Sequence, residues 1–274
     1  MRVTFWGVRG SLASPGPETV RYGGNTACVE IRDSSGGLII LDAGTGIRRL
    51  GATLSDARRI HLFLTHLHLD HLQGLGFFAP LFQPEVEVDI WGPPSLRANL
   101  ATRLNQYLSP PLFPVRLKEL ASRVTLHPAP TEPIRVGSVE IVSELIIHPG
   151  PTVGYRLSEG DRTVAYLPDH EPALGVRRFP EAPEWTSGYA LAKGVDLLIH
   201  DAQYSADERS TRIGWGHSSL DEAVAFAKDI GAAALAPFHH DPTHSDDDLD
   251  ELFRMVTGGT VELVPAVEGT SVRI

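Results

Sequence analysis

The segment from residue 66 to residue 71 reads His-Leu-His-Leu-Asp-His and holds four groups that can bind a metal ion. It follows an apolar run at residues 62–64, which predicts a strand that ends where the motif begins. His66 and His68 are two positions apart, so an extended backbone would point both rings the same way. Burying such groups is costly unless metal or water satisfies them, and a solvated polar loop is the alternative interpretation. Imidazole and carboxylate donors without a thiolate fit zinc, manganese or iron.

One segment of this length cannot complete the coordination of two metal ions, so other ligands have to come from elsewhere in the chain. Acids and histidines that directly follow apolar runs are the candidates, because ligands converge in a crevice at the carboxyl ends of strands. Four residues have this placement, namely Asp42, His148, Asp169 and His239. His240 follows His239 directly, so the spacing alone leaves open which of the two is the last ligand.

Short apolar runs separated by turn residues predict strands in both halves of the chain. The expected strands occupy residues 3–5, 28–31, 38–41, 60–65, 86–91, 139–147, 153–157, 163–167, 197–199 and 233–238. Helical patterns predict helices at residues 95–108, 117–121, 219–229 and 246–256. The turn-forming stretch at residues 33–37 predicts a hairpin between the second and third strands. Strands followed by helices in each half favour a layered α/β fold.

The composition is that of an acidic chain long enough to bury a sizeable core. The 274 residues include 24 basic and 34 acidic ones, and the net charge of −10 disfavours long polyanions as partners. The single cysteine, Cys28, excludes an intramolecular disulfide. The N-terminus lacks the features of a signal peptide, and no apolar run approaches the ~20 residues that span a bilayer. We therefore expect one cytoplasmic domain over residues 1–274, without a membrane partner.

In their chain order, these motifs resemble the metallo-β-lactamase superfamily. That family has an aspartate after an early strand, a His-x-His-x-Asp-His segment, a later histidine, a bridging aspartate and a final histidine. The resemblance implies an α/β fold built as a four-layer αββα sandwich, with two divalent metal ions, zinc first and manganese or iron as alternatives. It also implies that Asp42 orients a ligand histidine and that His239, rather than His240, is a ligand. The implied ligands are His66, His68 and His148 for the first metal, Asp70, His71 and His239 for the second, and Asp169 for both.

Two later segments narrow the resemblance to the tRNase Z branch of that superfamily. Residues 200–203, His-Asp-Ala-Gln, are similar to its His-Glu-Ala-Thr segment, and residues 216–219, Gly-His-Ser-Ser, to its Gly-His-Ser-Thr segment. The resemblance implies that His217 donates a proton or contacts phosphate and that Asp201 orients it, although aspartate is one methylene shorter than the family's glutamate. A structural histidine before a helix-capping serine is the alternative interpretation of His217.

One departure from that branch concerns the size of the substrate. Its tRNA-processing members carry a long protruding arm between the later histidine and the bridging aspartate. Here His148 and Asp169 are 21 positions apart, and two expected strands fill that interval. We therefore expect a phosphodiesterase that acts on small phosphodiesters, cyclic nucleotides among them, rather than on long nucleic acids. A hydroxide bridging the two metals would attack the phosphorus, and Asp70 and Asp169 would fix and polarise it.

Other functions remain open at this point. A thioester or lactam hydrolase of the glyoxalase II type would use the same two-metal site but would need neither His217 nor Asp201. An RNA 3′-processing endonuclease would need an RNA affinity that falls steeply with salt. A non-catalytic binding module is a third alternative, against which the complete ligand set argues. The chain also leaves open a homodimer, and the proline-rich loop at residues 108–114 could be a lid, a dimer contact or a rigid connection.

Two further histidines lie near the motifs and are expected to have no ligand role. His170 follows Asp169 directly, and we expect it at the surface or at the rim of a pocket. His244 lies in an aspartate-rich turn, where we expect it to be solvated.

Overall fold

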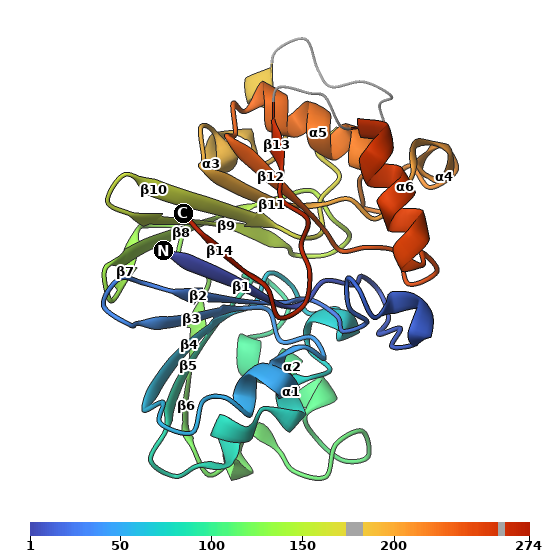
Figure 1. The fold of residues 1–274 in the computed structure, drawn as a ribbon. Coiled ribbons are helices and arrows are strands. Elements are labelled where there is room, and N and C mark those ends of the chain that lie inside the picture. The colour runs from blue at the N-terminus through green and yellow to red at the C-terminus, as the bar shows by residue number, and fades with distance from the viewer. Residues whose placement is uncertain (174–182, 257–260) are drawn as a thin grey trace.

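Two seven-stranded sheets pack face to face in the computed structural model, which describes residues 1–173, 183–256 and 261–274 (Figure 1). The first sheet has the order β14-β1-β2-β3-β4-β5-β6, and the second the order β13-β12-β11-β10-β9-β8-β7. The first sheet consists of β1 (Arg2–Gly7), β2 (Cys28–Arg32), β3 (Leu38–Leu41), β4 (Arg59–Phe63), β5 (Glu87–Gly92), β6 (Arg123–Pro128) and β14 (Ser271–Arg273). The second consists of β7 (Ile134–Val136), β8 (Val139–Leu145), β9 (Val153–Glu159), β10 (Arg162–Leu167), β11 (Leu197–Asp201), β12 (Ala234–Phe238) and β13 (Glu262–Leu263).

Helices cover the outer face of each sheet. The first sheet is covered by α1 (Ile47–Gly51) and α2 (Leu100–Tyr107), and the second by α3 (Tyr189–Ala192), α5 (Leu220–Asp229) and α6 (Asp246–Val256), as Figure 1 shows. The short helix α4 (Ala206–Ser210) precedes α5 in the chain. Single 3-10 turns occupy Pro17–Thr19, Leu69–His71, Leu75–Phe77, Ala79–Phe82, Leu117–Glu119 and Pro183–Trp185.

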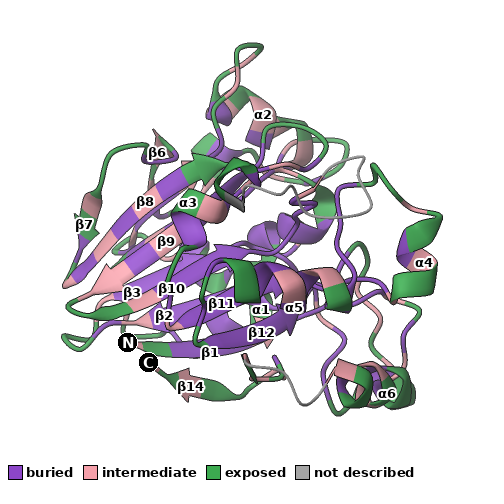
Figure 2. Cartoon of the chain, turned by 90° about the horizontal axis from the view of Figure 1, so that it is seen from above, coloured by how far each residue is buried: buried purple, intermediate pink, exposed green. Residues whose placement is uncertain are grey.

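Three clusters of buried apolar side chains hold these layers together. The central cluster lies between the sheets and includes Phe5, Tyr155 and Phe238, whereas the other two pack each sheet against its helices. Figure 2 shows β11 and β12 buried along their whole length, as expected for strands covered on both faces. Burying a large apolar side chain contributes about 1.5–3 kcal/mol, so the packing of layers dominates stability. The predicted four-layer αββα sandwich is confirmed.

Parallel strands bring the ends of distant segments to one edge of the sandwich. In the first sheet β3 pairs in parallel with β4, and Leu41 lies opposite Phe63. In the second sheet β10, β11 and β12 are parallel neighbours, and Asp201 lies opposite Phe238. Residues that directly follow these strands therefore meet at the same edge, because neighbouring parallel strands end at similar heights.

The predicted hairpin and the later helix agree closely with the structure. β2 and β3 pair antiparallel around the turn at residues 33–37, as predicted. The predicted helix at residues 219–229 is α5, and Ser219 and Glu222 form a capping box at its start. The predicted helix at residues 95–108 is shorter, because Asn99 accepts a hydrogen bond from the Thr102 amide and caps α2 there. The expected helix at residues 117–121 is only one 3-10 turn.

The elements that the sequence did not predict are short or lie at sheet edges. They are the strands β6, β7, β13 and β14 and the helices α1, α3 and α4. Edge strands bury only part of their surface, so their apolar pattern is weak. Among the described residues, no helix is both long enough and apolar enough to cross a membrane.

Candidate metal centre

Three histidines from both sheets meet at the common edge. His66 and His68 follow β4, and His148 follows β8. Nε2 of His148 lies 3.2 Å from Nδ1 of His68, and the ring centroids of His66 and His148 are 4.9 Å apart. His66 and His148 are buried, whereas His68 is exposed at the mouth of the site. The structure thus brings together the three histidines predicted to hold the first metal.

A second group lies directly beside the first. Nε2 of His239 lies 3.3 Å from Nε2 of His71 and 3.1 Å from Oδ2 of Asp70. Nε2 of His71 lies 3.3 Å from the same Asp70 oxygen. All three side chains are buried. These are the residues predicted to hold the second metal, and their role as ligands stays a prediction.

Asp169 stands between the two groups. Its Oδ1 lies 2.9 Å from Nε2 of His71, in the second group. Its Oδ2 lies 3.7 Å from Nε2 of both His66 and His148, in the first group. The same oxygen lies 3.3 Å from Nε2 of His239. One carboxylate therefore reaches both groups, which is the placement expected of a bridging ligand.

Each of the four buried candidate ligand histidines is held by a hydrogen bond that its Nδ1 atom makes with an outer partner. A carbonyl or carboxylate oxygen can only accept, so Nδ1 donates to it and Nε2 of a neutral ring stays available to a metal. Gln203, which the sequence analysis gave no role, is one of these partners. The pairs are His71 with Asp42 Oδ2 (2.8 Å), His148 with the Gly216 carbonyl (2.8 Å), His239 with Gln203 Oε1 (3.2 Å) and His66 with Thr65 Oγ1 (3.1 Å).

Asp42 is the most heavily hydrogen-bonded of these outer partners. It accepts bonds from the Thr65 amide at 2.8 Å and hydroxyl at 2.9 Å, and from the Tyr166 hydroxyl at 3.0 Å. Asp42 and His71 are both fully buried, so their contact is shielded from water. The contact that we expected between Asp42 and a candidate ligand histidine is present.

Three residues of the site adopt left-handed backbone conformations that favour glycine. The φ angles of Ser11, Asp42 and His239 are 57°, 60° and 61°. Such conformations cost of the order of 1–3 kcal/mol each and cluster at functional sites. The Ser11 amide uses this conformation to donate to Asp70 Oδ2 at 2.8 Å. The fold thus stores strain at the positions that aim the candidate ligands.

The packing of the two rings distinguishes His239 from its neighbour His240. The ring of His239 packs on Gly10, where a Cβ atom would lie 2.3 Å from Nδ1. The ring of His240 lies instead 6.2 Å from that of Tyr22 and 5.9 Å from that of Phe253 on α6. Among the groups of the described residues that could hold a metal, none includes His240. The geometry therefore favours His239 as the last ligand.

His217 lies against the cluster and is held by Asp201. Its Nδ1 lies 2.6 Å from Oδ2 of the fully buried Asp201, and its ring stacks on that of His239 with centroids 5.0 Å apart. A ring nitrogen of His217 lies within 4.8 Å of ligand atoms of His148 and Asp169. Burial lowers the pKa of His217, but the Asp201 carboxylate outweighs it and raises the pKa to about 8. The contact with Asp201 therefore favours the protonated form of the His217 ring beside the candidate ligands.

A buried ion pair positions the loop that carries His217. Glu171 accepts hydrogen bonds from the amides of Gly214 at 2.9 Å and Gly216 at 2.8 Å. Arg209 donates to Glu171 at 2.7 Å and to Glu222 at 2.8 Å, so it joins this loop to the start of α5. The role of Glu171 was not predicted from the sequence, although its position two residues after Asp169 places it at the same sheet edge.

The cluster suits divalent cations on two grounds. Nε2 of His66 is buried and has no hydrogen-bond partner in the described part of the chain, a state that costs about 1–3 kcal/mol. Burial lowers the pKa of His71, yet the carboxylates of Asp169, Asp70 and Asp42 raise it well above its usual value. A cation would satisfy the nitrogen of the first group and supply the positive charge that the second group attracts. Imidazole and carboxylate donors fit zinc, manganese or iron.

The expectations for His170 and His244 were wrong. His170 is fully buried, and its Nδ1 lies 2.9 Å from Nε2 of His200. His244 is only 9% exposed, and its Nε2 lies 3.1 Å from Oε1 of Glu208. In both cases the ring is buried because it bonds a partner from another segment of the chain, and the polarity of the local sequence does not reveal such a partner.

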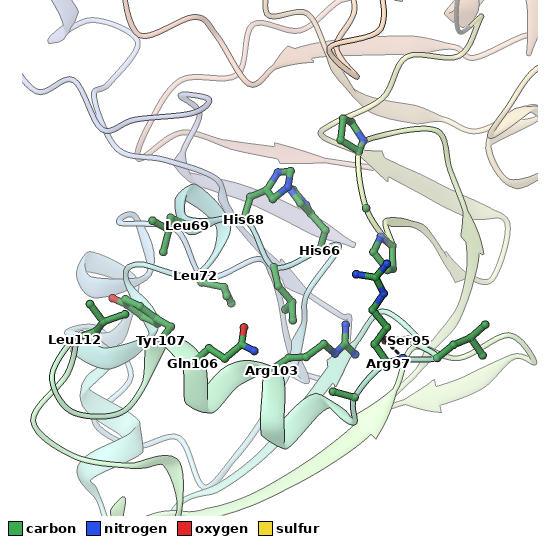
Figure 3. Close-up of a pocket in the computed structure, with 16 residues that line it drawn as sticks. His66, His68, Leu69, Leu72, Ser95, Arg97, Arg103, Gln106, Tyr107 and Leu112 are labelled. Atoms are coloured by element: carbon green, nitrogen blue, oxygen red, sulfur yellow. Dashed lines mark hydrogen bonds between the residues drawn. The ribbon is translucent and has the colours of Figure 1, made fainter.

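Two cavities adjoin the cluster and share no lining residue. The larger, of about 880 Å³, includes His66 and His68 and extends along α2 toward Tyr107 (Figure 3). The smaller, of about 380 Å³, includes His217 and the exposed Trp215. Ligand cavities typically measure about 300–1,000 Å³, so each could take a small organic group.

The fold and the ligand cluster together define a domain of the metallo-β-lactamase type. A family model described as Beta-lactamase superfamily domain matches residues 38–240, and the chain belongs to that superfamily. The family predicted from the motifs is thereby confirmed.

Individual relatives are similar over nearly the whole chain. Ribonuclease Z from Haloarcula marismortui is 27% identical, over 100% of this chain and 97% of its own length. The metallo-β-lactamase fold protein YhfI from Bacillus subtilis has a TM-score of 0.71 at 21% identity, over 99% of both chains. Human tRNase Z, short form, has a TM-score of 0.68 at 21% identity, over 100% of this chain and 99% of its own. At these identities the two structures show a shared fold.

Proposed function

We propose that the protein is a dinuclear metal-dependent phosphodiesterase that acts on small phosphodiesters. The observation that carries this proposal is His217, a histidine that Asp201 holds beside the seven candidate ligands. Thioester and lactam hydrolysis would have no need of this additional pair. A relative named ribonuclease Z supports phosphodiester chemistry.

The candidate ligands divide between two metals, with zinc as the proposed ion. His66, His68 and His148 would hold one, Asp70, His71 and His239 the other, and Asp169 both. When bound, two such cations would act as Lewis acids on the phosphoryl group and make water a nucleophile near neutral pH.

The chain's own residues then orient the substrate and move the leaving-group proton. A phosphodiester lying across the cluster would have a cavity available for each of its two substituents, one beside His68 and one beside His217. The His217 imidazolium would hydrogen-bond a phosphoryl oxygen or protonate the departing alkoxide, and Asp201 would keep the ring in the donating orientation. Glu171 would act indirectly, because it holds the amides on either side of Trp215.

A leaving-group comparison tests the role of His217. p-Nitrophenolate is a good leaving group that needs little protonation, whereas the ribose alkoxide of a dinucleotide needs it strongly. We expect His217→Ala to lower kcat on a dinucleotide by about 10²–10⁴-fold, and to lower kcat on bis(p-nitrophenyl) phosphate much less. The bound metal, measured on the same samples, should stay at the wild-type level.

His127→Ala is the matched control, because it removes a histidine that bonds Asp89 on β5 outside the cluster. It should turn over both substrates at the wild-type rate. Equal losses of His217→Ala on both substrates would contradict a proton donor, and wild-type turnover of thioesters but not of phosphodiesters would contradict the proposed function.

A second candidate function is RNA 3′-end processing, which the name of the relative favours. Against it, the interval between His148 and Asp169 holds only short connections and the strands β9 and β10, with no protruding arm. The net charge of −10 also disfavours a long polyanion. Cleavage of a precursor tRNA, with an affinity that falls steeply as salt rises, would favour this candidate instead.

A further inference from the structure

The larger cavity combines two arginines with the mouth of the metal centre. Arg97 precedes α2 and Arg103 lies on it, and both line the cavity that includes His66 and His68. Figure 3 shows the two histidines at one end of the cavity, with Arg97 and Arg103 toward one side and Leu69 and Leu112 toward the other. One continuous cavity thus connects the two histidines with both arginine side chains.

Within the part of the chain that the structure describes, no carboxylate balances the charge of either guanidinium group. Within the described residues, no carboxylate oxygen of Asp or Glu lies within 4.0 Å of Arg97 or Arg103, although acids outnumber bases in this chain. Arg103 donates from Nη2 to the Pro93 carbonyl at 2.5 Å, and its buried Nε has no hydrogen-bond partner among the described residues. Arg97 is exposed. Guanidinium groups whose charge no carboxylate balances are well suited to phosphate, which they can bind in a bidentate manner.

The opposite wall of the cavity is apolar. Leu69 is 61% exposed and Leu112 is 70% exposed, a large apolar area for side chains this close to a polar cluster. The Tyr107 hydroxyl is already engaged, since it donates to the Gln73 carbonyl at 2.7 Å, so its ring contributes an apolar surface to the cavity. A flat ring such as a nucleobase would cover these side chains and gain hydrophobic contact.

We propose that this cavity binds an ester substituent that carries a second phosphate, with a nucleoside between the two phosphates. One phosphate would lie at the metal centre, the other would meet Arg97 and Arg103, and the base would pack on Leu69, Tyr107 and Leu112. This inference rests on the proposed function and names the substrate class of the same site.

Binding of two nucleotides that differ only in the second phosphate tests the inference without requiring turnover. Thymidine 3′,5′-bisphosphate and thymidine 5′-monophosphate are titrated calorimetrically into the metal-loaded protein. We expect the bisphosphate to bind at least about tenfold more tightly, as for a charge-assisted hydrogen-bonded contact. Equal affinities of the wild type for the two nucleotides would overturn the proposal.

Substitutions then assign the preference to the cavity. Arg97→Gln should abolish most of the preference for the bisphosphate, and Arg97→Glu should remove or reverse it. Arg48→Gln is the matched control, because Arg48 is exposed on α1 and does not line the cavity. It should keep the full preference. An unchanged preference in both Arg97 variants and in Arg103→Gln would overturn the proposal.

The p-nitrophenyl esters of the same two nucleotides link binding to catalysis. The wild type should show a higher kcat/KM for the ester of the bisphosphate than for the ester of the monophosphate. Arg97→Gln should lower this preference between the two esters by about tenfold. A chain that turns over neither ester but still prefers the bisphosphate would contradict the phosphodiesterase function and keep the cavity assignment. A chain that turns over both esters equally well would support the phosphodiesterase function and contradict the cavity assignment.

Discussion

At the residue scale, the candidate ligands could be recognised before the structure, whereas their supports could not. His66, His68, Asp70 and His71 fall within six positions, so their density alone indicated chemistry. Gln203 and Glu171 are single polar residues without a distinctive spacing, and only the tertiary structure shows what they hold. Residue type predicts what a side chain can bind, but the partner of a buried polar group is set by packing.

A substitution at Gly10 tests whether close packing holds the ring of His239 in position. A Cβ atom at Gly10 would lie 2.3 Å from Nδ1 of His239, so Gly10→Ala should displace that ring. We expect metal affinity to fall by about 10–100-fold, as for the loss of an outer partner, measured by competition with a chelating dye. Gly16→Ala is the control, because no atom lies within 4 Å of the added methyl group. Wild-type metal affinity in Gly10→Ala would contradict the role of the His239 ring, in its position on Gly10, as a metal ligand.

At the element scale, strands were predicted well where they are buried and poorly where they are not. The central strands β3, β4 and β12 carry continuous apolar runs, and the motif residues follow their ends as expected. The start of α2 was placed too early, because the cap at Asn99 overrides the apolar spacing that begins before it. Local hydrogen bonds set element boundaries, and periodicity does not report them.

Asp33 links two hairpins and should make stability depend on pH. Burial raises its pKa, but hydrogen bonds from Ser138, Ser35 and Gly37 outweigh it and lower the pKa to about 2. Because the folded pKa lies below the unfolded value, the ionised carboxylate stabilises the fold above pH ~4, and this contribution is lost as pH falls through 2.

Asp33→Asn should therefore lower the free energy of unfolding by about 1–2 kcal/mol at pH 7, and by less at pH 3, as measured by urea denaturation. Asp56→Asn, an exposed position, should change it by less than about 0.5 kcal/mol at either pH. The same loss at both pH values would show that the carboxylate charge is not responsible.

At the scale of the whole molecule, the candidate metal centre joins the two sheets. His66, His68, Asp70 and His71 come from the first sheet's loops, whereas His148, Asp169 and His239 follow strands of the second. The chain order of the motifs led to the family resemblance, and the resemblance predicted the four layers. The packing of the two sheets explains why segments far apart in the chain meet at the candidate metal centre. Composition and charge could not place the cavities, because their walls combine loops with residues of α2 that only the tertiary structure brings together.

Metal removal should therefore loosen the whole sandwich rather than a single loop. A ligand at about 1,000 times its Kd stabilises the folded state by about 4 kcal/mol. We expect chelation to lower Tm by about 5–15 °C in the wild type, measured by calorimetry, and readdition of zinc to restore it. In Asp169→Ala the chelator should have little effect. A wild-type Tm that does not respond to chelation would contradict a metal shared between the sheets.

The most direct test of a dinuclear phosphodiesterase is to measure bound metal and bis(p-nitrophenyl) phosphate hydrolysis on the same samples of wild type and Asp169→Ala. Asp169 reaches both ligand groups, so its loss should affect both metals. The wild type should hold about two metal ions per chain and turn over the diester, and Asp169→Ala should lose metal and nearly all turnover. A wild-type chain that takes up no metal, or an Asp169→Ala variant with full turnover, would contradict the assignment.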